Sequence, residues 1–295
     1  MYLLRNEGKI KGGEEMDYTY RFMRFKDGKA KALTLSYDDG IDQDIRLANI
    51  LDKKGIKCTF NISAGRFAPE GTTYPDDRVG GRRMSKSQAL ELYKDSGHEV
   101  AIHGYTHPNL ANLPTNHMMY EIIEDRKELE EIFGTLVRGC AYPFGSFNDD
   151  VVDILRLAQI KYARTTISTY NFKMPKDWLR LEPTCHHRSA QFMELAEKFV
   201  EMTPVGPQLF YVWGHSYEFD KDNNWDVIEK FADYIGGRED IWYATNIEIY
   251  DYVEAYNNLQ ISADGKRVYN PSVIDVWMYA EGEVYKIPAG ETVKL

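Results

Sequence analysis

Short apolar runs alternate with longer amphipathic segments from about residue 31 to residue 258. The runs are rich in strand-forming residues and each ends at polar or turn residues, whereas the segments between them carry apolar residues at helical spacing. The pattern predicts strands at 32–37, 57–62, 98–103, 137–141, 162–166, 208–214 and 241–245. It predicts helices at 42–54, 85–94, 115–133, 149–159, 190–201, 225–235 and 247–257, with Ser85 as the N-cap of the second.

This alternation predicts βα units, in which right-handed crossovers build a parallel sheet. Seven units closing on themselves predict an α/β fold, a distorted seven-stranded (β/α) barrel, with its chemistry at the C-terminal ends of the strands. From Leu259 the pattern changes to a turn signal and two alternating segments, which predicts a small C-terminal β appendage packed on the barrel. We therefore expect an N-terminal extension at 1–30, a barrel domain at 31–258 and the appendage at 259–295.

Composition narrows the expected partners. Lysine and arginine number 36 against 46 acidic residues, a net charge of −10 that argues against nucleic acid or an anionic membrane as the main partner. Three widely separated cysteines suggest reduced thiols. The first residues show no apolar core typical of a signal peptide, and no apolar run is long enough to span a bilayer. We expect a cytoplasmic protein with no membrane partner, and the oligomeric state stays open.

Candidate chemistry lies where predicted strands end. The first strand runs into Asp38, Asp39 and Gly40, although this trio alone is also typical of an ordinary turn. His103 and His107, four residues apart, follow the third strand, and spaced histidines completed by a carboxylate are common metal ligands. Two histidines in a polar loop are the alternative. Because these residues end strands of one predicted barrel, we predict a metal site there.

Two further strand ends carry polar features. In Tyr142-Pro143-Phe144-Gly145 the proline fixes the backbone, so that the following N–H can serve as an oxyanion donor. A plain turn built from proline and glycine is the alternative. Trp213-Gly214-His215 ends the sixth strand with a third histidine, which is expected to face the same mouth of the barrel.

Taken in order, these motifs resemble the polysaccharide deacetylases of carbohydrate esterase family 4, over roughly residues 31–258. The resemblance implies Asp38 as the catalytic base, His215 as the general acid and Phe144 as the oxyanion donor. It implies three ligands of a divalent metal ion, Asp39, His103 and His107. Zinc is the first expectation, with cobalt, manganese or nickel as alternatives. The implied substrate is an acetylated carbohydrate, with Tyr142, Trp213 and Trp178 as substrate-binding residues.

The chain departs from the family pattern in two places. Two residues before the third-motif proline the family usually has an arginine that pairs with the catalytic aspartate, and Ala141 stands there. Arg164, at the end of the next strand, either takes that role or forms a surface salt bridge. The fourth motif, which orients the catalytic histidine, is reduced to the candidate Asp177-Trp178. Glu218 and Asp220 are nearby candidates for the same role.

Cys185-His186-His187 suggests a second metal site, although neighbours on a strand face opposite ways.

The expected function is metal-dependent hydrolysis of acetyl groups, N-acetyl first, from a short oligosaccharide or a monosaccharide derivative. One alternative is an iron oxygenase with two histidines and one carboxylate as ligands. Asp38 and His215 argue against it, because an oxygenase needs neither. Others are an amidohydrolase acting on a non-sugar amide, as in the allantoinase-like branch, and a carbohydrate-binding relative that has lost catalysis.

Overall fold

The computed structural model describes residues 21–75, 78 and 80–295. Its main sheet is parallel and curled, with strand order β6-β5-β4-β3-β2-β8-β7, and β9 also pairs with β2. This arrangement confirms the predicted α/β fold with a distorted seven-stranded barrel. The strands of this sheet are β2 Lys31–Asp38, β3 Cys58–Ile62, β4 Glu99–Ile102, β5 Gly139–Ala141, β6 Tyr162–Arg164, β7 Cys185–His186, β8 Gln208–Gly214 and β9 Ile241–Tyr243.

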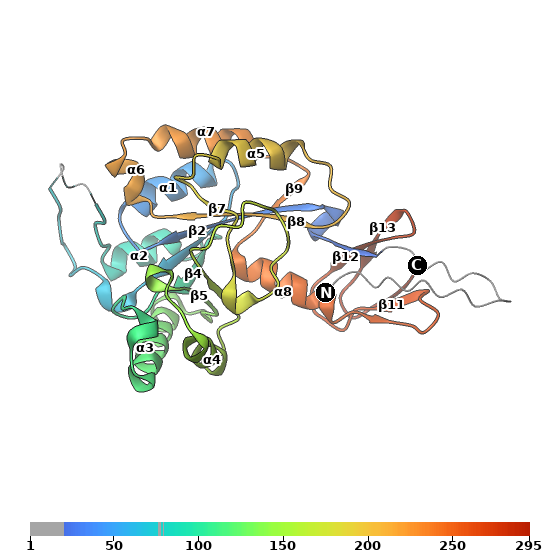
Figure 1. Cartoon of the computed structure of the whole chain (residues 1–295), viewed down its shortest axis with the longest axis horizontal. Coiled ribbons are helices and arrows are strands. Elements are labelled where there is room, and N and C mark those ends of the chain that lie inside the picture. Colours follow the sequence, from blue (N-terminus) through green and yellow to red (C-terminus); the bar gives the residue numbers. More distant parts are fainter. Residues whose placement is uncertain (1–20, 76–77, 79) are drawn as a thin grey trace.

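Helices cover both faces of the curled sheet. In Figure 1, α1, α5 and α7 lie above the sheet, and α3 and α4 lie below it. The helices are α1 Gln43–Asp52, α2 Lys86–Tyr93, α3 Thr115–Phe133, α4 Asp149–Leu157, α5 Phe192–Glu201, α6 Tyr217–Lys221, α7 Trp225–Ile235 and α8 Asn246–Asn257. No helix in the described ranges is both long and apolar enough to cross a bilayer.

Local sequence fixes several helix ends. Ser85 caps α2 in a reciprocal capping box with Gln88, as predicted, and Thr245 caps α8 in the same way with Glu248. Gly134 ends α3 in the left-handed conformation, at φ 68°, that a residue without a side chain adopts most readily. The short helix α6 was not predicted, because five residues are too few to show helical periodicity.

The central strand β2 organises the barrel. Every one of its residues is buried, and its second half lies between β3 and β8, so that its C-terminal end reaches the middle of the barrel mouth. Apolar side chains such as Leu33 and Leu35 hold the strand in the core, which leaves the carboxylates that follow them at the mouth.

The C-terminal appendage consists of two small antiparallel sheets at one end of the molecule, which confirms that part of the predicted fold (Figure 1). Its strands are β10 Gln260–Ile261, β11 Arg267–Tyr269, β12 Val276–Ala280, β13 Glu283–Ile287 and β14 Thr292–Lys294. Strand β1, Phe22–Arg24, joins one of these sheets by pairing with β12. Residues 1–20 of the predicted N-terminal extension lie outside the described residues. The predicted domain boundaries stay predictions.

Candidate metal centre and active site

Three predicted ligands meet at the mouth of the barrel. Asp39 directly follows β2, and His103 and His107 follow β4, the second strand over in the sheet. One ligand atom from each lies within 4.8 Å of the others, and His107 Nε2 is 3.7 Å from Asp39 Oδ1. The strand ends of a parallel sheet therefore bring together a carboxylate and two imidazoles, a donor set that suits a divalent transition metal.

The backbone is strained at this point. Asp39 has φ 94° and His107 has φ 60°, values that residues with a side chain seldom adopt. Such conformations cost energy and persist where the surroundings enforce them, commonly at functional sites. Here the unusual backbone turns both side chains back toward His103.

The hydrogen bonding of His103 fits metal binding. Its Nδ1 lies 2.8 Å from the carbonyl oxygen of Ala141, which can only accept, so Nδ1 carries the proton and Nε2 keeps a free lone pair. Burial lowers the pKa of His103, and burial lowers the pKa of His107 to about 4, so both rings are neutral at pH 7. Neutral imidazoles are the form that binds a metal.

Helix α3 holds the loop that carries the two histidines. Asp125 accepts hydrogen bonds from the backbone N–H groups of Ala64, at 2.6 Å, and His103, at 2.9 Å. One turn earlier, Glu121 accepts from both the backbone and the hydroxyl of Thr106, each at 2.7 Å. Sequence reasoning missed these acids, although buried carboxylates on the apolar side of an amphipathic helix are a usable signal.

Arg83, from the long loop after β3, was also missed. Its guanidinium donates to Asp39 Oδ1 at 2.9 Å and to the backbone oxygen of the same residue. Burial alone would raise the pKa of Asp39, but Arg83 and the nearby histidines lower it by more. The loop reaches this position because Met84 N–H donates to the Gly40 oxygen and Asp42 N–H to the Arg82 oxygen, so the two segments run side by side.

Asp38 is almost fully buried. It is 2% exposed, Asn61 donates to its Oδ1 at 2.8 Å, and Arg164 donates to its Oδ2 at 2.5 Å. Burial alone would raise the pKa of Asp38, but Arg164 and then His103 lower it by more, so the pKa lies below its usual range. The group is therefore a carboxylate at neutral pH, within reach of the ligand cluster.

Arg164 lies in the interior rather than in a surface salt bridge. Its side chain is fully buried and its guanidinium stacks 4.4 Å above the Trp213 ring. It comes from the end of β6, beside Ala141 in the pairing of β5 with β6. The arginine thus reaches Asp38 from the strand next to the one on which the family pattern places it.

His215 faces Asp38 from the other side of the mouth. Its Nε2 is 3.9 Å from Asp38 Oδ2, and its Nδ1 is 3.4 Å from Glu218 Oε2, which also accepts the His215 backbone N–H at 3.1 Å. Burial alone would lower the pKa of His215, but the contact with Glu218 and the charge of Asp38 raise it by more. The ring is therefore held toward its protonated form.

Other candidates for orienting His215 have different partners. Asp177 accepts from the Leu179 N–H and pairs with Arg180. Asp220 accepts from Trp225 Nε1 at 2.7 Å and from the Gln43 side chain at 3.1 Å. Of the predicted candidates, Glu218 is the one in contact with His215.

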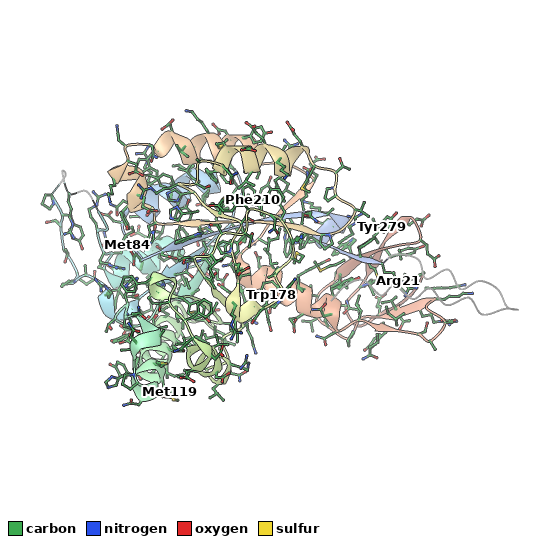
Figure 2. The ribbon with its side chains drawn as sticks, viewed as in Figure 1. Arg21, Met84, Met119, Trp178, Phe210 and Tyr279 are labelled. Atoms are coloured by element: carbon green, nitrogen blue, oxygen red, sulfur yellow. The ribbon has the colours of Figure 1, made fainter. Side chains whose placement is uncertain are left out.

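The predicted substrate-binding aromatics are mostly covered. Tyr142 is 1% exposed and its hydroxyl donates to the Leu179 oxygen, while Trp213 lies beneath Arg164. Trp178 packs edge-on against Tyr250 of α8, and Figure 2 shows it apart from Met84, which follows Arg83 at the mouth. Little of Tyr142 and Trp213 is left for a sugar to stack on.

Phe144 is an exposed aromatic residue beside the cluster of predicted ligands. Its ring is 68% exposed and its centroid lies 4.6 Å from that of His107. Its backbone has φ 58° between Pro143 and Gly145, and the role of its N–H as an oxyanion donor stays a prediction. The side chain of Phe144 therefore lies exposed beside His107.

A family model described as polysaccharide deacetylase matches residues 25–163. The uncharacterized protein YlxY of Bacillus subtilis is 30% identical over 130 residues, which are 44% of this chain and 36% of that protein. Chitin deacetylase 1 of Cryptococcus neoformans is 29% identical over 118 residues, 40% of this chain and 22% of that protein. The chain thus spans only about a third and a fifth of the lengths of these two curated relatives.

A solved structure from Mycobacterium smegmatis, named provisionally as a polysaccharide deacetylase, aligns over 80% of this chain and 94% of its own. The TM-score is 0.56 at 16% sequence identity, so this likeness shows the fold alone. The curled parallel sheet with acids and histidines at its strand ends is an α/β barrel of the deacetylase type. By the family model, residues 25–163 of the chain match the polysaccharide deacetylase family.

Proposed function

We propose that this protein is a metal-dependent deacetylase that removes acetyl groups, N-acetyl above all, from a carbohydrate. The family is one of polysaccharide deacetylases, and a relative that matches part of the chain is named for chitin, a polymer of an N-acetylated sugar. The residues at the mouth of the barrel supply the groups that amide hydrolysis requires: a base, an oxyanion donor and an acid.

Asp39, His103 and His107 would hold the metal ion, since their neutral and anionic donor atoms converge and His103 presents a free Nε2. When bound, a divalent ion supplies Lewis acidity, which makes a water molecule more acidic and polarises the acetyl carbonyl. Zinc suits these ligands, and cobalt, manganese and nickel stay alternatives.

Asp38 takes the proton from the attacking water. Arg164 and Asn61 keep this carboxylate charged and fixed, which is what a general base in a closed site needs. The Phe144 backbone N–H donates to the oxygen that becomes negative as the carbonyl is attacked. His215, kept protonated through Glu218, gives a proton to the departing nitrogen.

The observation that carries the proposal is the pairing of Asp38 and His215. A carboxylate held charged and an imidazole held toward its protonated form lie 3.9 Å apart beside one ligand cluster. Groups with opposite shifts of pKa are what acid–base catalysis uses. An iron oxygenase needs neither group, and a module that only binds sugar has no use for both.

The test is acetate release from a panel of acetylated mono- and oligosaccharides by metal-loaded protein. We expect release that requires divalent metal and falls by about 10²–10⁴-fold in Asp38→Asn and in His215→Ala. His117→Ala, which changes an exposed histidine on α3, is the matched control and should retain activity. Unchanged release in both active-site variants would overturn the mechanism. Metal binding without release from any sugar, but with release from non-sugar amides, would replace the substrate class.

A further inference from the structure

A second group of two histidines and a carboxylate lies beside His215. His186 Nε2 and His187 Nε2 lie 3.2 Å and 3.4 Å from Glu218 Oε2, and the three ligand atoms lie within 4.8 Å of one another. The group, called here the β7 cluster, combines the end of β7 with the first turn of α6. The proposed mechanism assigns no role to its histidines.

The two adjacent histidines face the same carboxylate although strand neighbours were expected to diverge. Strand β7 ends at His186, where the chain turns back as Ser189 N–H donates to the His186 oxygen. His187 then points inward, stacked between the rings of Tyr37 and Phe219. Gly214 provides the space, because a Cβ at that position would lie 2.0 Å from His187 Nδ1.

The side chain of His187 is 1% exposed, yet neither of its ring nitrogens has a hydrogen-bond partner in the described structure. An unpaired buried polar atom is costly and calls for a partner. Burial lowers the pKa of His187, so the ring is neutral and can act as a ligand. Burial alone would raise the pKa of Glu218, but contacts with His186 and His215 lower it by more, so Glu218 is a carboxylate.

The spacing also suits a small cation. Two ligands of a tetrahedral zinc ion, each about 2.0–2.1 Å from the metal, lie about 3.3 Å apart. The separations of 3.2 Å and 3.4 Å from Glu218 Oε2 match that value, so the side chains need little movement to enclose the ion.

We propose that the β7 cluster is a second, weaker zinc site, and that zinc bound there inhibits the enzyme. A cation on Glu218 Oε2 occupies the oxygen that accepts the His215 backbone N–H and lies 3.4 Å from His215 Nδ1, so the general acid loses the group that holds it in place. The inhibition rests on the proposed function, whereas zinc binding at the cluster does not.

One feature makes this site the weaker one. His186 Nδ1 accepts the Arg188 backbone N–H at 3.0 Å, and this bond must be given up when Nε2 binds a cation. The first cluster has no such competing bond on His103, so it fills at lower zinc concentration.

Equilibrium dialysis against zinc, with the bound metal counted, tests the site. We expect two zinc ions on the wild type, one on Asp39→Asn, one on His187→Gln and fewer than one on the double variant. His186→Asn, at a more exposed position, should weaken the second binding at least about tenfold, as loss of a ligand requires. No zinc on Asp39→Asn, with one on the wild type, would overturn the proposal. If the wild type and Asp39→Asn each bind one zinc ion and His187→Gln binds none, zinc binding at the β7 cluster is supported. The metal centre proposed at Asp39, His103 and His107 is then ruled out.

Acetate release at rising zinc concentration is the second readout. The wild type and the control His117→Gln should lose activity in excess zinc, while His187→Gln and His186→Asn keep their basal activity and resist inhibition. Equal inhibition of all four proteins would overturn the inhibitory role. A thermal melt of each variant without zinc identifies any loss that comes from misfolding.

Discussion

The two histidine–carboxylate clusters at the barrel mouth use the same kinds of side chain, but the fold supports them differently. In the first, both the ring and the backbone of His103 are held in place. Its ring Nδ1 faces the Ala141 oxygen, and its backbone N–H donates to Asp125. In the second, consecutive histidines share one carboxylate, and the ring nitrogens of His187 have no hydrogen bond among the described residues. A common ligand type therefore does not define a site, whereas the groups that hold the ligands in place do.

The difference extends to the carboxylates. Asp39 is fixed by Arg83 and faces two imidazoles whose pKa values are lowered by burial. Glu218 accepts the backbone N–H of His215, so its first role is to hold the proposed general acid in place. Four substitutions test how far the two halves of the mouth are independent.

Arg164→Met should have the largest effect, because Arg164 and Asp38 join the two halves. Removing one partner of a buried ion pair costs about 3–5 kcal/mol of unfolding free energy, and we expect a loss of that order in denaturant unfolding at pH 7. The folded pKa of Asp38 is depressed, so the pair contributes above the unfolded pKa and its contribution disappears as pH falls. The deficit should therefore shrink in acid. Arg156→Met, at the exposed pair with Asp153, should cost less than about 1 kcal/mol, and an equal loss in both variants would contradict the comparison.

Asp125→Asn tests the support of the first cluster alone. An amide cannot accept both backbone N–H groups, so His103 should lose its fixed position and zinc affinity should fall about 10–100-fold in a chelator competition. Binding at the β7 cluster should not change. Glu131→Gln, on the exposed side of the same helix, serves as control. Unchanged zinc affinity in Asp125→Asn would show that the two hydrogen bonds accepted by Asp125 are not needed for zinc binding.

Glu218→Gln tests the other half. Removing the charge should lower the pKa of His215, so the alkaline limb of kcat/KM should move to lower pH, while zinc affinity at the first cluster stays the same. The loss at the optimum should be smaller than the loss on removing His215. Asp220→Asn is the control, and a pH profile that matches the wild type would reject Glu218 as the residue that orients His215.

Phe144→Ala should have the smallest effect. The proposed oxyanion donor is a backbone N–H that remains in the variant, so kcat should change little. Loss of an exposed ring beside His107 should raise KM by about 2–10-fold, the equivalent of one aromatic contact. A large fall in kcat with unchanged KM would mean that the side chain, and not the backbone, serves the reaction.

Sequence patterns predicted most of the fold because β2 and its neighbours are continuous apolar runs with turn residues after them. The same logic grouped Asp38, Asp39 and the histidines, since parallel strands end at one edge. What could not be predicted depends on contacts between distant segments. Arg83 reaches Asp39 from a loop without periodicity, and the covering of Tyr142 and Trp213 depends on Leu179 and Arg164.

The pairing of β1 with β12 sets an order of assembly. Phe22 faces Tyr279 across this pair, so almost the whole length of the chain separates two neighbouring residues. Every strand of the barrel lies between them, and the barrel can pair all its strands once Tyr243 at the end of β9 has been made. Contacts of such separation form slowly, because a long loop must close first. During synthesis the barrel is thus able to fold before β1 pairs with β12, and the appendage closes last.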